Sequence, residues 1–104
     1  MLDKKKAREI ARRYADLVRR TYQPSKVILF GSSVNGNPHE HSDIDIAVVF
    51  NGYEGNWLET WTDLFYLRES LSFDIEPHLV DETNDQSGFL AHIEKTGELV
   101  YEAS

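Results

Sequence analysis

The pattern of apolar and polar positions alternates between segments of helical period and short apolar runs. The first helical segment follows Asp3, a suitable N-cap, and should end before Pro24, because a residue preceding proline is pushed out of helical geometry. A second apolar stripe predicts a helix from about residue 56 to residue 71. A third begins at Phe89, and Gly97 can end it.

The short apolar runs predict strands. Residues 26–30 and 43–50 are rich in β-branched side chains and read as buried strands. Residues 72–80 alternate between apolar and polar positions, which is the period of a half-buried strand. Pro77 indicates that this strand lies at a sheet edge or bulge, and residues 98–101 are expected to form a short extended tail.

These elements predict an α/β (α+β) fold, with a small mixed sheet of three or more strands and helices packed on one face. The 104 residues suit a single domain spanning 1–104. A domain of this size buries only part of its surface, so a homo- or hetero-oligomeric partner is plausible. The chain has no cysteine, no run long enough to cross a membrane and no signal peptide, so we expect a cytoplasmic protein.

Charge divides the chain unevenly. The net charge is −7, yet nine of the eleven Lys and Arg residues lie in residues 1–26, and fifteen of the eighteen acidic residues lie in residues 27–104. A basic first helix on an acidic body suggests a polyanion or an acidic partner surface at that helix. The alternative is a solvated helix face that offsets the acidic body.

The candidate chemistry centres on three aspartates. Asp43 and Asp45 interrupt an apolar strand, and residues two apart on a strand point to the same face. Two carboxylates this close repel unless a cation or proton lies between them, and hard oxygen ligands suit Mg²⁺ or Mn²⁺. Asp74, on the next predicted strand, would complete a site for two ions, which suits in-line phosphoryl displacement. Glu76 faces the same side as Asp74 and is the alternative third ligand.

A small-residue turn supplies the opposite polarity. Gly31 and Ser32 follow the first strand, and backbone N–H groups in such a turn can hold a phosphate that glycine allows to approach closely. Ser42, at the end of the polar loop 33–42, joins them as a nucleotide-binding candidate. Each motif alone is common, and only their combination indicates nucleotide chemistry.

For the histidines and tryptophans, we favour structural roles over functional ones. His39 and His41 flank Glu40 in the loop and could contact phosphate, although loop polarity is the favoured interpretation, and the same holds for His78. Trp57 and Trp61 lie outside any basic patch and are expected to belong to the helix core rather than to a base-stacking surface.

The string from Leu29 to Ser32, followed after ten residues by Asp43 to Val48, resembles the signature of the polymerase-β-like nucleotidyltransferases. More narrowly, the whole chain resembles the minimal nucleotidyltransferases (MNT) encoded beside HEPN-domain proteins, and residues 73–79 match the third strand of that family. The resemblance implies that Gly31 and Ser32 contact the nucleotide phosphates and that the three aspartates bind the metals. Many relatives carry arginines shortly after the Gly-Ser pair, whereas this chain has Ser33, Val34 and Asn35 there.

The resemblance also implies an activity and a partner. Such proteins transfer AMP from ATP to a hydroxyl of a HEPN ribonuclease toxin, bind the toxin as antitoxins, or do both. Three alternatives stay open: a catalytically silent module that only caps its partner, an enzyme that nucleotidylates a small molecule, and a nucleic-acid polymerase. The last is disfavoured because the chain is short and acidic, so direct nucleic-acid binding is not expected. The small-molecule enzymes are usually longer, with a second domain that holds the substrate.

Overall fold

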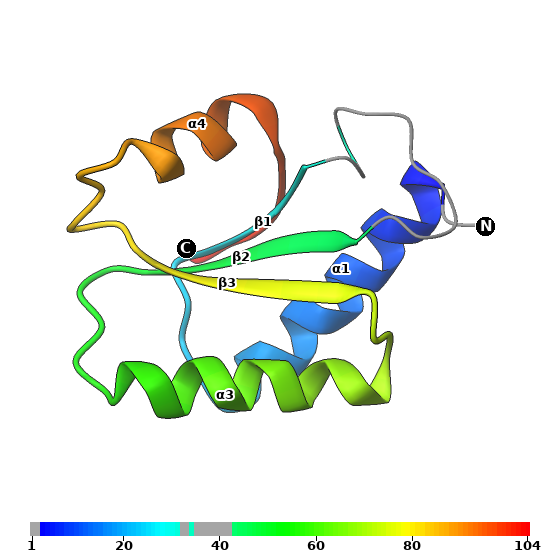
Figure 1. The fold of residues 1–104 in the computed structure, drawn as a ribbon, viewed down its shortest axis with the longest axis horizontal. Coiled ribbons are helices and arrows are strands. Elements are labelled where there is room, and N and C mark those ends of the chain that lie inside the picture. The colour runs from blue at the N-terminus through cyan, green and yellow to red at the C-terminus, as the bar shows by residue number, and fades with distance from the viewer. Residues whose placement is uncertain (1–2, 32–33, 35–42) are drawn as a thin grey trace.

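The computed structural model describes residues 3–31, 34 and 43–104, and its elements alternate between helices and strands (Figure 1). In chain order they are α1 (Lys4–Arg19), β1 (Lys26–Phe30), β2 (Ile44–Phe50), α3 (Trp57–Leu67), the short 3₁₀ turn η1 (Arg68–Ser70), β3 (Ile75–Asp81), α4 (Phe89–Thr96) and β4 (Glu98–Glu102). The predicted cap of the first helix is confirmed, since the Asp3 carboxylate accepts a hydrogen bond of 2.7 Å from the Lys6 N–H.

The strands form one mixed sheet in the order β3-β2-β1-β4. Strand β1 runs antiparallel to both β2 and β4, and β2 runs parallel to β3. The predicted α/β (α+β) class with a mixed sheet is confirmed. The expected extended tail is strand β4, at one edge of the sheet, and Pro77 lies on β3 at the opposite edge, as its missing N–H predicts.

Helices α1 and α3 cover one face of the sheet and share its larger core. Alternate residues of β1 and β2, including Val27, Leu29, Ile46 and Val48, pack against them. The Tyr14 hydroxyl of α1 is buried and donates a hydrogen bond of 2.6 Å to the Leu64 carbonyl of α3. This bond fixes the two helices to each other beneath the sheet.

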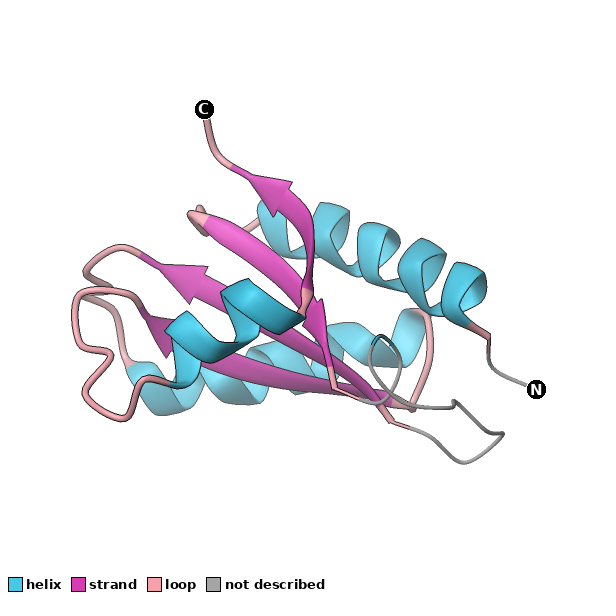
Figure 2. Cartoon of the chain, turned by 90° about the horizontal axis from the view of Figure 1, so that it is seen from above, coloured by secondary structure: helices cyan, strands magenta, loops and turns pink. Residues whose placement is uncertain are grey.

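Helix α4 lies on the opposite face, so the expectation that helices pack on one face alone needs correction. Leu90 and Ile93 of α4 pack against Ile28, Ala47 and Val49, the residues that alternate with the larger core. Figure 1 shows α4 above the sheet and α3 beneath it, and in Figure 2, which is seen from above, the short helix α4 crosses in front of the strands. The physical reason is that both faces of the central strands are apolar over part of their length, so each needs cover.

The second predicted helix is shorter than expected, and its core residues differ. Its α-helical part ends at Leu67, and Trp57 and Trp61 are 44% and 42% exposed, which corrects their assignment to the core. The buried residues of α3 are Thr60 and Leu64 instead. The helix carries aromatic and apolar side chains around most of its circumference, so their periodicity does not show which side is buried.

Among the residues that the structure describes, one ion pair connects the basic helix to the acidic body, and two others lie within the helix. The Arg8 side chain lies 2.7 Å from the Glu98 carboxylate of β4, and Arg13 and Arg19 have acidic neighbours within α1.

Across the described ranges, no helix is both long and apolar enough to cross a membrane.

Candidate active site

The predicted catalytic residues gather at one end of the sheet. Strand β1 ends there and strands β2 and β3 begin there, because β2 runs antiparallel to β1 and parallel to β3. The register places Phe30 opposite Asp45, and Asp45 opposite Glu76. The turn after β1 and the acidic residues of β2 and β3 therefore lie side by side.

Gly31 and Asp45 fit together closely at this end. Gly31 has φ of 81°, a left-handed conformation that favours glycine. A Cβ atom added at Gly31 would lie 3.3 Å from Asp45 Cγ and closer still to Oδ2. The Asp45 carboxylate thus occupies the space that a side chain at position 31 would need.

The paired aspartates keep the predicted spacing at the start of β2. Asp43 precedes the strand by one residue and is exposed, whereas Asp45 lies within the strand and its side chain is 26% exposed. Asp45 alternates with Ile44 and Ile46, which are fully buried in the larger core. It therefore lies on the face of the sheet that carries α4, not on the face covered by α1 and α3.

The third carboxylate lies outside the strand that was predicted to hold it. Strand β3 begins at Ile75 rather than at residue 72, and Phe73 is 67% exposed, so Asp74 belongs to the turn before the strand. The Ile44 N–H donates a hydrogen bond of 2.8 Å to the Asp74 carbonyl, which places Asp74 beside Asp43. Asp74, in the turn before β3, and Glu76, within β3, thus border the aspartate pair from the same side.

His78 contacts the site, although the sequence favoured loop-like polarity for it. Its Nε2 lies 3.1 Å from Asp45 Oδ1, and its ring packs at 4.9 Å from the Phe30 ring. Phe89 of α4 completes the aromatic group, with its ring 5.5 Å from that of Phe30. The signal available in the sequence was the two-residue alternation that puts His78 on the same face as Glu76.

Several candidates lie outside the described residues. Ser32 and Ser42, predicted to bind nucleotide, belong to this group, and so do His39 and His41. Their roles stay predictions.

The donor chemistry fits a divalent metal ion. Asp43 and Asp45 offer hard carboxylate oxygens two residues apart, and Mg²⁺ is usually held by one or two carboxylates together with substrate phosphates. Over residues 3–31, 34 and 43–104, no group of three or more His, Asp or Glu side chains is arranged to hold a metal ion. Metal binding by Asp43 and Asp45, and the identity of a third ligand, stay predictions.

Comparisons with known proteins find similarity to nucleotidyltransferases. A family model described as polymerase β nucleotidyltransferase matches residues 12–104. A provisionally assigned nucleotidyltransferase from Sulfolobus solfataricus has a similar fold, with a TM-score of 0.65 and 24% identity over 95% of this chain and 83% of that chain. A chain from a toxin–antitoxin crystal structure with AMP-PNP is similar too, with a TM-score of 0.68 and 25% identity over 89% of this chain and 74% of that one. The curated protein sequences give no match.

Proposed function

The chain belongs to the polymerase β nucleotidyltransferase family, and we propose that it transfers AMP from ATP to a hydroxyl group of a partner protein. The observation that carries the proposal is the fit between Gly31 and Asp45 at the end of β1. That fit joins a turn suited to a phosphate to a carboxylate suited to a metal ion. Neither feature alone favours nucleotide transfer, whereas their contact does.

The proposed reaction is an in-line displacement at the α-phosphorus of ATP. The acceptor hydroxyl oxygen forms a new bond to that phosphorus, and the bond to the bridging oxygen of the leaving pyrophosphate breaks. The hydroxyl proton passes to a carboxylate, for which Asp74 is our candidate and Glu76 the alternative. The turn at Gly31 holds the phosphates through backbone N–H groups while the reaction proceeds.

Asp43 and Asp45 would hold the metal, with Asp74 as the expected third ligand. When bound, Mg²⁺ or Mn²⁺ supplies positive charge against the phosphate oxygens, and two ions suit this class of displacement. His78 keeps the Asp45 carboxylate oriented through the 3.1 Å contact. Ligand-orienting hydrogen bonds of this kind commonly support metal sites.

The proposed partner is a toxin that this chain neutralises as an antitoxin. Support comes from the similar chain in a toxin–antitoxin structure that contains AMP-PNP. The choice of a HEPN ribonuclease as the toxin rests on the resemblance to the MNT family. The second candidate function is a module that caps its partner without catalysis, and small-molecule nucleotidylation is the third.

Mass spectrometry of a reconstituted reaction tests the proposal. The chain is incubated with Mg²⁺, ATP and the protein encoded by the neighbouring gene, and a mass gain of one or more AMP units on that protein is expected. Asp45→Asn should remove the gain. Asp16→Asn serves as the matched control, because Asp16 is an exposed carboxylate on α1, away from the sheet end.

Two other outcomes would change the assignment. Neutralisation of the partner by Asp45→Asn, with no AMP added by the wild type, would favour the capping module. Mg²⁺ should also raise the melting temperature of the wild type and of Asp16→Asn but not of an Asp43→Asn, Asp45→Asn double variant. An equal rise in all three proteins would remove the aspartates from the metal site.

A further inference from the structure

We propose that the groove along the outer edge of β3 binds an extended, basic segment of the partner protein, which adds to the sheet as a further strand and carries the acceptor hydroxyl. This inference rests on the proposed function, because it names how the acceptor reaches the same site. Four features of the groove carry it: its walls, its backbone floor, its charge and its connection to Asp45.

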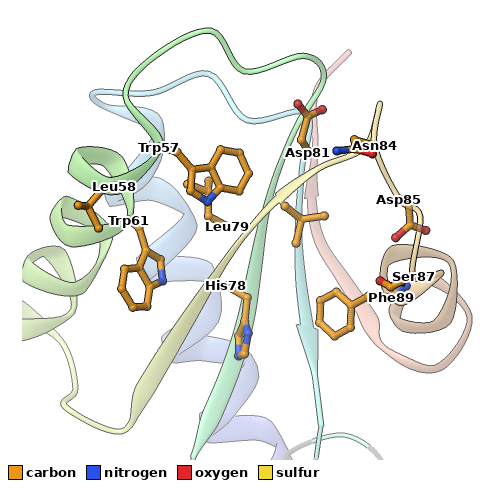
Figure 3. A pocket seen from close by; sticks show the side chains of 11 residues that line it. Trp57, Leu58, Trp61, His78, Leu79, Asp81, Asn84, Asp85, Ser87 and Phe89 are labelled. Carbon is orange, nitrogen blue, oxygen red and sulfur yellow. Dashed lines mark hydrogen bonds between the residues drawn. The ribbon is translucent and has the colours of Figure 1, made fainter.

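The walls of the groove are aromatic and come from two elements. Figure 3 shows Trp57 and Trp61 of α3 on one side of β3, and Phe89 at the start of α4 on the other. The groove has a volume of about 660 Å³. Exposed apolar side chains that gather in one patch, as Trp57, Trp61 and Phe89 do here, mark interaction sites, and aromatic residues are enriched in such sites.

The floor of the groove is an open strand edge. The hydrogen bonds from Ile44 N–H to Asp74 and from Glu82 N–H to the Phe50 carbonyl show that the even-numbered residues at this edge bond to β2. Because backbone groups alternate in direction along a strand, those of Pro77 and Leu79 face outward. In the described part of the chain, no hydrogen bond is made to the Leu79 N–H or carbonyl from outside β3.

The start of this edge is closed, and so is the Asp81 carbonyl, which accepts a hydrogen bond of 3.1 Å from the Asn84 N–H. The Arg68 guanidinium donates hydrogen bonds of 3.1 Å and 2.9 Å to the carbonyls of Phe73 and Ile75. It thereby caps the outward backbone groups before Pro77. An added strand would find its partners in the Pro77 carbonyl and in the N–H and carbonyl of Leu79, whose side chain lines the groove. Strand addition to an exposed edge is a recurring mode of peptide recognition.

Charge selects a basic segment. Asp81 and Asp85 line the groove, and residues 27–104 hold fifteen acidic side chains against two basic ones. Aspartate carboxylates are charged at neutral pH, and hydrogen bonds from Thr83 lower the pKa of Asp81 further. A nucleic acid would be repelled here, and a second copy of this strand would bring like charges together.

His78 connects the groove to the catalytic end of the sheet. Its ring lines the groove, while its Nε2 lies 3.1 Å from Asp45 Oδ1. A segment that pairs with Leu79 and runs toward the start of β3 therefore approaches the carboxylates. Because the groove leads to Asp45, the bound segment is expected to present its hydroxyl to the carboxylates rather than only to hold the partner protein at a distant point.

Tryptophan fluorescence reports occupation of the groove directly, because both tryptophans of the chain line it. The partner's segments are first tested as overlapping synthetic peptides that lack tryptophan, without ATP or metal. We expect one basic peptide containing a Tyr, Ser or Thr to shift the emission saturably. If ATP alone shifts the emission and the peptides do not, the groove is a nucleobase site and the proposal is overturned.

A pair of variants at one position separates backbone pairing from side-chain packing. Leu79→Pro removes the outward N–H, as Pro77 already does two residues earlier, whereas Leu79→Ala removes side-chain contacts and keeps the N–H. Peptide affinity should fall at least tenfold in Leu79→Pro and much less in Leu79→Ala. Equal affinity for both variants, with circular dichroism showing both folded, contradicts strand addition.

A second pair of variants on α3 covers the case in which Leu79→Pro does not fold. Trp57→Ala opens the groove wall, and Tyr66→Ala removes a similarly exposed aromatic residue of α3 that does not line the groove. Trp57→Ala should lower both peptide binding and AMP transfer, with ATP binding unchanged. Tyr66→Ala should change none of the three, and identical behaviour of the two variants would contradict the proposal.

The docking assay needs no catalysis, so the two proposals can fail separately. Peptide binding by the Asp43→Asn, Asp45→Asn double variant, with no transfer by the wild type, would support the groove and refute the enzyme. AMP transfer at wild-type rate by both Leu79→Pro and Trp57→Ala would support the enzyme and overturn the groove.

Discussion

Replacing Gly31 with alanine tests whether the turn after β1 and the Asp45 carboxylate form one unit. Gly31 has φ of 81°, and holding an L-residue in this region costs roughly 1–2 kcal/mol. The added methyl group would also meet the Asp45 carboxylate inside normal contact distance. The carboxylate therefore has to turn away from its present position.

Turning the carboxylate adds a second cost. Asp45 would lose its hydrogen bond with His78, a contribution of about 0.5–1.5 kcal/mol. We expect Gly31→Ala to lower the free energy of unfolding by roughly 1.5–3.5 kcal/mol in total. In a domain of this size each kcal/mol shifts the melting temperature by about 4–8 °C.

Gly88→Ala is the matched control. Gly88 has nearly the same φ, 75°, but an added Cβ would meet nothing within 4 Å. This variant should therefore show only the backbone cost of roughly 1–2 kcal/mol. The difference between the two variants isolates the contact between position 31 and the carboxylate.

Urea denaturation gives the two free energies, and the Mg²⁺-induced melting shift with the AMP-transfer assay gives the functional effect. Gly31→Ala should lose most of both functional signals, since small misplacements in a reacting site can cost about a hundredfold in rate. Gly88→Ala should keep both. Equal destabilisation by the two variants, with the metal response and transfer intact in Gly31→Ala, would refute the proposed unit.

Three further predictions concern single side chains. Tyr14→Phe should lower the free energy of unfolding by about 0.5–1.5 kcal/mol in chemical denaturation, because the buried Leu64 carbonyl loses its donor. Asp74→Asn should abolish AMP transfer while Glu76→Gln retains it, and the opposite result would assign the third carboxylate to Glu76. The pKa of Asp81 lies below its usual value of 3.8, so its stabilisation is present above that pH and is lost as pH falls through the lowered pKa. Asp81→Asn should therefore flatten the loss of stability in acid, and an unchanged pH profile would contradict this.

Local signals in the sequence were sufficient for the first half of the fold. Asp3 caps α1 and the helix ends before Pro24, as the cap and the proline predict. The apolar runs became β1 and β2, whose central residues are buried on both faces. These signals depend only on neighbours in the chain, so they can be read without knowledge of the tertiary structure.

Tertiary packing decided what periodicity could not. On α3, Thr60 is buried because its hydroxyl is hydrogen-bonded to that of Tyr53, while Trp57 and Trp61 remain at the surface. A pattern based on hydrophobicity assigns the threonine outward and the tryptophans inward. The position of α4 was likewise hidden, because its apolar stripe shows that a face is buried but not which face of the sheet it covers.

In the candidate site, too, some features follow from the local sequence and others depend on the tertiary structure. The sequence predicts that Asp43 and Asp45 point to the same side, because they are two residues apart on one strand. It also predicts the turn at Gly31, because this glycine directly follows an apolar strand. The contact of His78 with Asp45 depends on the parallel register of β2 and β3, which the sequence does not specify. The groove depends on α3 and α4 together, so only the assembled fold reveals it.

The short length of α4 explains why the carboxylates are accessible. Leu90 and Ile93 cover Ile28, Ala47 and Val49, the part of the sheet face remote from the catalytic end. Toward that end, among the described residues of α4, Phe89 borders the face, and its ring approaches those of Phe30 and His78. A longer helix continuing across this face would bury Asp45 and exclude a nucleotide.

The same limited cover leaves the edge of β3 available. Phe89 borders both the carboxylate end and the groove, and His78 contacts Asp45 while lining the groove. In the proposed complex, β3 would present its polar face to the nucleotide and its outer backbone edge to the acceptor segment. Because the two surfaces share His78, a partner strand that pairs beyond Pro77 would bring its hydroxyl to the end of the sheet that holds Asp43 and Asp45, without any movement of the sheet.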